Sequence, residues 1–318
     1  LKCNCDIAMS LDVPTNPMYS GESLFFNTFE DCLYQTLGYL DIFDKQGDND
    51  KFLLNVIQGQ GVDMEHWYSE VKGYDFLGWA FGGGKKNRLA YIIDIILRMI
   101  YDGKFEKNIV WLHFLGISDL KTAVLLTAIK NALNARFDHC HVVVSYDTST
   151  PFRLGAGLIT ALDKPAISPT QITNRLTQID KSGWADNPAK FPFGYSAISQ
   201  YLTMGDIVTT RRNGEPFVDR LGYLLLQNHN LEAYMNSIDA MNQIMSCGAP
   251  NHQLRSVLPI HLLEGRDAIY HVLSQRNIKT AFNLLWKPDT LLALDNSRRN
   301  ILKPPSLHSA KSKVYKLK

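Results

Sequence analysis

The sequence predicts an α/β fold built on a parallel β-sheet, and three observations lead to this prediction. Short apolar runs alternate with longer helical stretches through the first 150 residues. The short runs are rich in Val, Ile, Leu and Phe and mostly lack polar alternation, as is typical of strands buried on both faces. Polar or glycine-rich residues follow each run. Strand–helix repetition of this kind indicates βα units and a parallel sheet.

Five strands and four intervening helices are predicted. The strands are Asp6–Asp12, Leu53–Gln58, Phe76–Gly82, Ile109–Gly116 and Val142–Asp147, and the helices cover residues 25–44, 62–72, 86–102 and 118–135. The third helix is the clearest, because its apolar residues between Leu89 and Ile100 have the spacing of one buried helical face. An open, doubly wound sheet accommodates five strands, whereas a (β/α)₈ barrel needs three more βα units. No G-x-G-x-x-G follows the first strand, which disfavours a dinucleotide-binding open sheet.

The character of the chain changes after residue 150. Proline and glycine break up the stretch to about residue 194, and the pattern from Tyr195 to Met245 is helical apart from a turn at residues 211–216. More helix is predicted at 265–284. The last 22 residues hold seven Lys or Arg and no acid, so they form either a solubilising tail or a polyanion contact. We therefore expect a sheet domain over 1–194, a helical region over 195–296 and a basic disordered tail over 297–318.

Composition bounds the function only loosely. The chain is 45% hydrophobic with a net charge of +2, which is ordinary for a soluble globular protein, so any nucleic-acid footprint must be local. No signal peptide and no apolar run of roughly 20 residues is present, which favours the cytoplasm. The five cysteines lack zinc-finger spacing and are predicted to be free thiols.

The predicted strands end in mostly polar or glycine-rich segments, at the edge where parallel α/β folds bind ligands. They are Asp12, Gln58, the loop Gly82–Lys85, Leu115 with Gly116, and Asp147 followed by Arg153. A carboxylate and a carboxamide can pair with the edge of a purine-like base, and a second carboxylate can attack an anomeric carbon. Each has an ordinary structural alternative: a helix cap for Asp147, backbone pairing for Gln58, a flexible turn for the glycines and a surface charge for Arg153. Pro151 argues against a helix starting directly after Asp147.

These strand ends resemble the tRNA-guanine transglycosylase family in order and spacing. Ile57-Gln-Gly59 and Gly78-Trp-Ala-Phe-Gly-Gly83 resemble its I-Q-G and G-Y-A-V/I-G-G motifs. Ser10-Leu-Asp12 resembles F-D-E, His113-Phe-Leu-Gly116 resembles Y-L-M-G, and Asp147 with Pro151 and Arg153 resembles F-D-x-x-x-P-T-R. Leu226-Gln-Asn-His-Asn-Leu231 resembles a later H-N-L helix. The resemblance covers residues 6 to about 245.

The resemblance implies a (β/α)₈ barrel represented by about its last five βα units, with a helical appendage. It implies that Asp147 is the nucleophile that attacks C1′ and expels guanine. Asp12 and Gln58 match side chains that read the base edge, and Gly83, with Gly84 beside it, matches a backbone donor to the base carbonyl. Leu115 falls where a Met stacks on the base. Arg153 and Lys85 are the residues expected to contact the nucleic-acid backbone.

Two departures from the family pattern bear on function. The family's zinc site needs three closely spaced cysteines, and Cys247 is the only cysteine after Asp147, so we expect no metal. The D-S-G-G segment with the general acid/base carboxylate is absent. Because the chain opens at Leu1 on a strand-like run, we expect a truncated reading frame, with that segment lost or supplied by a separate polypeptide or a homodimer partner.

The expected activity is exchange of guanine in a polynucleotide for a 7-deazaguanine of the preQ₀ type, without a cofactor and without a membrane. Loss of the zinc subdomain is a feature of relatives that modify DNA, which favours DNA over tRNA. Two alternatives remain open: a non-catalytic nucleic-acid-binding partner subunit, and an unrelated barrel or open-sheet enzyme that binds a small phosphorylated substrate through the Gly82–Lys85 loop.

Overall fold

The computed structural model describes residues 5–15, 28–46, 52–82, 89–246 and 251–295. The chain divides into two compact units. The first is built from described residues within Leu1–Ile117, Ala128–Asp147 and Glu264–Lys318, and the second from those within Ser118–Thr127 and Thr148–Leu263. The expected boundary after residue 194 falls inside the second unit, and the expected basic tail, 297–318, lies outside the described residues.

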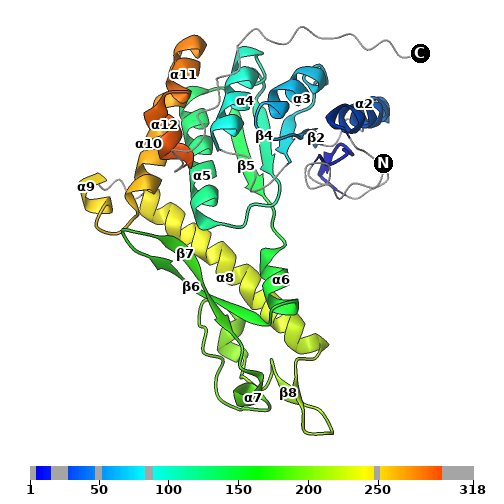
Figure 1. The fold of residues 1–318 in the computed structure, drawn as a ribbon, viewed down its shortest axis with the longest axis vertical. Coiled ribbons are helices and arrows are strands. Elements are labelled where there is room, and N and C mark those ends of the chain that lie inside the picture. The colour runs from blue at the N-terminus through cyan, green and yellow to red at the C-terminus, as the bar shows by residue number, and fades with distance from the viewer. Residues whose placement is uncertain (1–4, 16–27, 47–51, 83–88, 247–250, 296–318) are drawn as a thin grey trace. The chain divides into compact units, whose positions relative to one another are not determined.

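Strands and helices alternate through the first 146 residues, as the sequence predicts (Figure 1). The elements are β1 (Ile7–Met9), α2 (Phe29–Gln46), β2 (Phe52–Ile57), α3 (Asp63–Val71), β3 (Gly78–Phe81), α4 (Leu89–Tyr101), β4 (Ile109–Phe114), α5 (Leu120–Arg136) and β5 (His141–Tyr146). All five strands are parallel and lie in sequence order, β1-β2-β3-β4-β5. The prediction of an α/β fold on a parallel sheet is confirmed.

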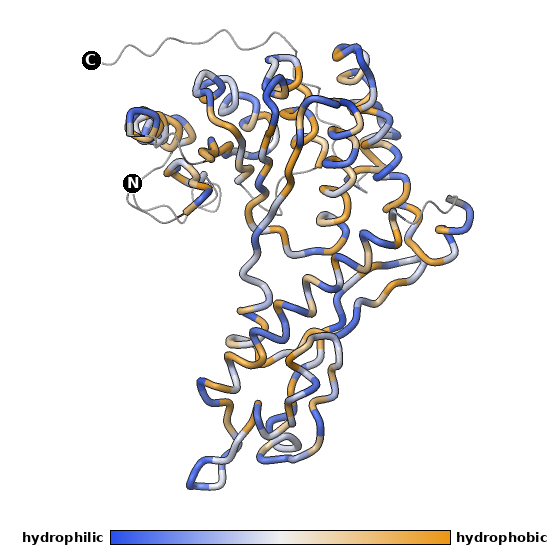
Figure 2. The backbone as a smooth tube through the Cα atoms, turned by 180° about the vertical axis from the view of Figure 1, so that it is seen from behind, coloured by the Kyte–Doolittle hydropathy of each residue, from blue (hydrophilic) through white to orange (hydrophobic). Residues whose placement is uncertain are grey.

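The two faces of the sheet have different surroundings. On one face Trp67 of α3 donates a hydrogen bond from Nε1 to the carbonyl oxygen of Val56, 2.9 Å away, and α5 contacts β5 through Asn134, which bonds both backbone groups of Val142. On the other face Leu54, Val56 and Ala80 form a small apolar cluster that Ile7 and Trp111 flank. Hydrophobic residues are frequent along the strands (Figure 2).

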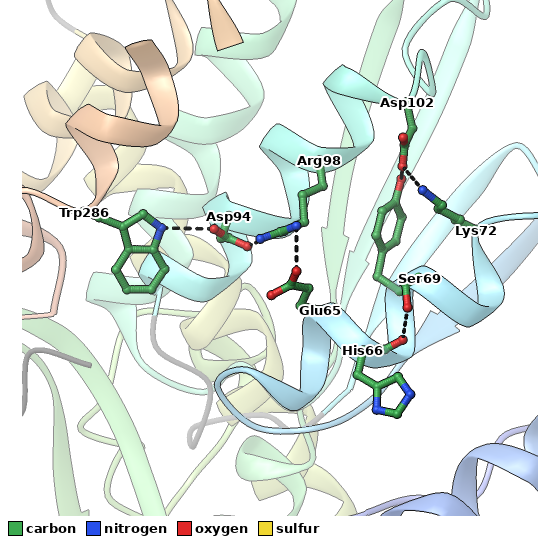
Figure 3. A network of polar contacts seen from close by, with 9 residues as sticks. Glu65, His66, Ser69, Lys72, Asp94, Arg98, Asp102 and Trp286 are labelled. Atoms are coloured by element: carbon green, nitrogen blue, oxygen red, sulfur yellow. Dashed lines mark hydrogen bonds and ion pairs between the residues drawn. The ribbon is translucent and has the colours of Figure 1, made fainter. Parts of the chain in front are cut away.

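Helix α4 is buried on all sides, which explains why its sequence is almost entirely apolar. Its two charged residues are paired: Arg98 donates from Nε to Asp94, 2.8 Å away, and from Nη1 to Glu65 of α3, 2.9 Å away (Figure 3). Burial raises the pKa of Asp94, although Arg98 opposes the shift. Removing one partner from such a pair leaves an uncompensated buried charge, so we assign this cluster a structural role.

Three helices lie at the C-terminal end of the described chain: α10 (Ile260–Leu273), α11 (Ile278–Leu285) and α12 (Pro288–Asp295). Of these, α11 and α12 pack against α4. Trp286 donates from Nε1 to Asp94 at 3.1 Å (Figure 3). Trp286 also packs edge-on against Tyr91, and Arg98 lies over the ring of Phe282. The helix expected at 265–284 is therefore present, but Ser274–Asn277 divides it in two.

The second unit differs most from expectation. Its elements are α6 (Thr150–Ala156), β6 (Thr160–Ile167), β7 (Ile172–Gln178), α7 (Lys181–Trp184), a 3₁₀ helix η2 (Ile198–Tyr201), β8 (Thr209–Thr210), β9 (Pro216–Phe217), α8 (Arg220–Ser246) and α9 (Asn251–Leu254). Strands β6 and β7 form an antiparallel hairpin that was not predicted. The expected helix from Tyr195 is wrong for residues 195–219, because the long helix begins only at Arg220.

A compact apolar core explains why residues 179–219 fold without long helices. Trp184, Phe191 and Phe193 pack against one another, with ring centroids 5.3–6.1 Å apart. Leu226 of α8 closes the same core. Tertiary packing of aromatic side chains therefore replaces regular secondary structure over this stretch, and periodicity alone gives no sign of it.

The expectation that Pro151 prevents a helix start is also wrong. Helix α6 begins at Thr150, with Pro151 in its first turn. A proline is favoured there, because its missing N–H has no partner to lose in the first turn and its φ is already helical.

Candidate functional site

The Asp12 and Gln58 side chains meet at the carboxyl ends of β1 and β2. Gln58 donates from Nε2 to Asp12 Oδ2, 2.5 Å away. Burial raises the pKa of Asp12, and the Gln58 hydrogen bond opposes that shift. The structure thus joins two of the residues predicted to read a base, and their shared bond fixes both side chains beside the end of the sheet.

Gln58 lies in a tight space and is only 4% exposed. A Cβ at Gly82 would collide with the Gln58 amide, so glycine at this position lets β3 approach the amide closely. Gln58 Oε1 is buried and accepts no hydrogen bond from any described residue. A buried acceptor without a partner costs free energy, so it provides a place for an N–H donor of a ligand.

Asp147 follows β5 and is exposed. Its Oδ1 accepts a hydrogen bond from the backbone N–H of Gly116, 2.7 Å away, and its own N–H donates to the Phe114 carbonyl. Gly116 adopts a φ of 75°, a left-handed conformation that glycine adopts without strain. The turn after β4 therefore holds one oxygen of the carboxylate, which leaves Oδ2 for chemistry.

Three residues near Asp147 were missed by the sequence analysis. Ser145 Oγ lies 2.8 Å from His113 Nδ1 and accepts a hydrogen bond from Trp111 Nε1, 2.6 Å away. His113 pairs in register with Ser145 across β4 and β5. The signal was available: His113 and Ser145 each lie two residues before a predicted site residue, and alternate residues of a strand share a face.

The other predicted residues are placed as follows. Leu115 is half-buried directly after β4 and donates its backbone N–H to Phe81. Arg153 lies on α6 with an exposed side chain, in the second compact unit. Gly83, Gly84 and Lys85 lie outside the described residues. The structure therefore brings Asp12 together with Gln58, and Asp147 together with the turn at Leu115 and Gly116.

A separate pocket of about 230 Å³ lies between α2 and α3. Leu33, Tyr34 and Leu37 of α2 form much of its wall, with His66 and Glu70 of α3 opposite. It contains none of the predicted site residues. The strand ends, with their paired and unpaired polar groups, are the better candidate for chemistry.

Across the described ranges, no group of three His, Cys, Asp or Glu side chains is arranged to hold a metal ion. Cys5, Cys32 and Cys140 are free thiols, while Cys3 and Cys247 lie outside those ranges. Within the same ranges no helix combines the length and apolar character needed to cross a membrane.

Comparison with known proteins gives no assignment: no protein-family model and no curated protein matches this chain.

Proposed function

We propose that this chain is a base-exchanging transglycosylase whose sheet is part of a (β/α)₈ barrel. The observation that carries the proposal is the placement of Asp12, Gln58, Leu115 and Asp147. All four follow strands of one parallel sheet at its carboxyl edge. Enzymes with (β/α)₈ barrels build their active sites at this edge.

The burial pattern of β4 supports a barrel over a doubly wound sheet. Its alternate residues Val110, Leu112 and Phe114 are fully buried, whereas Trp111 and His113 between them are only half-buried. Helices on both faces would bury both sets of side chains equally. The face opposite Val110, Leu112 and Phe114 is therefore less covered at β4, where Trp111 and His113 lie, and a barrel wall has helices on its outer face only.

The Asp12–Gln58 pair suits the hydrogen-bonding edge of guanine or a 7-deazaguanine. The Asp12 carboxylate accepts hydrogen bonds only, and Gln58 Oε1 is a second acceptor without a described partner. Guanine-type bases present adjacent ring and exocyclic N–H donors to such acceptors. Half-buried Leu115 provides an apolar surface for the face of the base.

Asp147 is the proposed nucleophile. Its carboxylate attacks C1′ of the target nucleotide as the C1′–N9 bond breaks, which gives a covalent glycosyl–enzyme ester. The Gly116 N–H fixes Oδ1, so that Oδ2 can approach C1′ in one orientation. The incoming base then displaces the aspartate. The target nucleotide must be flipped out of its stack to reach the site.

We propose a polynucleotide as acceptor, with DNA favoured over tRNA, and a preQ₀-type 7-deazaguanine as the incoming base. Arg153, Lys85 and the basic residues 297–318 are the groups proposed to contact phosphates. A cytoplasmic location and a partner polypeptide that completes the barrel belong to the same proposal.

Asp147→Asn tests the reaction directly. The amide keeps the shape of the carboxylate but is too poor a nucleophile to form the ester, so exchange of labelled guanine should fall by several orders of magnitude. The matched control is Asp138→Asn, an exposed aspartate just before the opposite end of β5, which should exchange at the wild-type rate. A covalent polynucleotide adduct should be trapped on wild type and absent from Asp147→Asn. Wild-type exchange by Asp147→Asn would refute the proposed function.

A further inference from the structure

Trp111, His113 and Ser145 form a short hydrogen-bonded chain beside the proposed nucleophile. Trp111 Nε1 can only donate, so one lone pair of Ser145 Oγ is occupied at 2.6 Å. The second contact of Ser145 Oγ is His113 Nδ1, at 2.8 Å. The imidazole is thus held at one nitrogen, by a side chain on the strand that carries Asp147.

The other ring nitrogen, Nε2 of His113, makes no hydrogen bond with any described residue. His113 is half-buried, on the accessible face of the sheet. Its titratable neighbour is Asp147 at the end of β5, whose charge acts on the imidazole, while β3 places Ala80 in register with it. A histidine held at Nδ1, with Nε2 unpaired and a carboxylate nearby, has the arrangement of a group that transfers protons.

We propose that His113 is the proton-transfer group of the exchange reaction, an inference that rests on the proposed function. As Asp147 Oδ2 bonds to C1′, the C1′–N9 bond breaks and its electron pair goes to guanine. The imidazolium gives its Nε2 proton to the leaving guanine and becomes neutral. When the new base attacks C1′, its N–H proton passes to Nε2, the C1′–O bond breaks, and the electron pair returns to Asp147. Every proton and electron pair is accounted for within the cycle.

The acidity of the His113 imidazolium changes with the charge of Asp147, in step with the two halves of the reaction. Burial lowers the pKa of His113, whereas the Asp147 carboxylate raises it. Ester formation removes the carboxylate charge, so the imidazolium becomes a stronger acid when guanine must be protonated. The charge returns when the incoming base must lose its proton. Ser145 serves both states in the same way: Nδ1 keeps its proton throughout the cycle, and the hydroxyl oxygen accepts from Nδ1 with one lone pair and from Trp111 Nε1 with the other.

The test is His113→Ala with and without added imidazole. General acid–base catalysis contributes about 10²–10⁴-fold, so exchange should fall by at least 100-fold, and imidazole filling the vacated space should restore part of it. Wild-type activity should decrease as pH rises through the pKa of His113, and this limb should be absent from His113→Gln. His141→Ala, an exposed histidine at the start of β5, is the matched control and should behave as wild type.

The outcomes separate this inference from the proposed function. If wild type exchanges bases and His113→Ala does so at the same rate, His113 has no role and the transglycosylase proposal stands. If His113→Ala is inactive, folded by circular dichroism and insensitive to imidazole, the residue only positions its neighbours and the inference is overturned. If wild type itself exchanges no base into DNA or tRNA, the proposed function is refuted, and the role of His113 that rests on it is refuted as well.

Discussion

Two histidines, His113 in the first unit and His229 in the second, have different environments. His229 is fully buried and both of its nitrogens are occupied: Nε2 lies 2.7 Å from the Leu162 carbonyl and Nδ1 lies 2.6 Å from Ser196 Oγ. Because a carbonyl only accepts, Nε2 carries the proton and Ser196 donates to Nδ1. His113 is half-buried and has a partner at Nδ1 alone.

Two side-chain amides repeat the contrast. Asn230 accepts from the Leu162 N–H at 2.7 Å and donates to the carbonyls of Thr160 and Pro151. Gln58 donates to Asp12 and keeps a buried oxygen that no described residue satisfies. The satisfied groups of His229 and Asn230 join a hairpin to a helix, whereas Gln58 and His113 each keep an atom that no described residue bonds. The H-N-L motif is therefore explained by folding and needs no role in chemistry.

The largest expected effect is on stability, in the second unit. Asn230→Leu should lower the free energy of unfolding by about 4 kcal/mol, because it removes the side-chain hydrogen bonds to three buried backbone groups. Thermal denaturation followed by circular dichroism measures this. Asn228→Leu, an exposed neighbour on α8, should change stability by less than about 1 kcal/mol. Equal effects of the two substitutions would contradict the stabilising role of the Asn230 hydrogen bonds.

Gln58→Met should have the opposite effect, with little change in stability and a clear loss of affinity for a base. It removes the unsatisfied oxygen, which offsets the loss of the hydrogen bond to Asp12, and it keeps a slender side chain beside Gly82, so the free energy of unfolding should change by less than about 1 kcal/mol. Base binding should weaken by about 10- to 100-fold, because the proposed hydrogen bond from the base edge to Gln58 is lost. Isothermal titration with a 7-deazaguanine measures the affinity, and Gln35→Met on α2 is the control. A large loss of stability with unchanged affinity would show that Gln58 is a structural residue.

The smallest expected effect is a pH dependence of stability that arises from His229. Burial lowers the pKa of His229, although the Leu162 carbonyl opposes the shift. The folded state therefore binds fewer protons than the unfolded state, in which histidine titrates near 6.5. The stabilisation is fully present above that pH and is lost as pH falls from about 6.5 through the lower folded pKa. Denaturant titrations of His229→Gln should show a shallower loss over that range, and an identical pH profile would contradict the assignment.

Much of the first unit is predictable from sequence because local pattern and tertiary environment agree there. Buried strands of Val, Ile and Leu alternate with helices such as α4, whose apolar residues recur with helical spacing. The second unit is less predictable because its core forms from contacts distant in sequence. Trp184, Phe193 and Leu226 meet in that core, yet no local period marks them.

The candidate site is predictable in part for a similar reason. Asp12, Gln58 and Asp147 follow apolar runs, so a parallel sheet must place them at one edge. The partner of each polar atom is set by side-chain rotamers and cross-strand register. The sequence alone does not identify His113 as the partner of Ser145, because that pairing depends on the register between β4 and β5.

The return of the C-terminal helices to α4 has a consequence for synthesis of the chain on the ribosome. Trp286, Phe282 and Asp295 contact α4, yet they are translated long after it. At 5–20 residues per second the nascent α4 waits on the order of ten seconds or more for its cover. During that interval a nearly wholly apolar helix is exposed, with Asp94 and Arg98 as its only charges. The second unit emerges within the same interval, so it can fold before the first is complete, and α4 is the segment that a chaperone would bind.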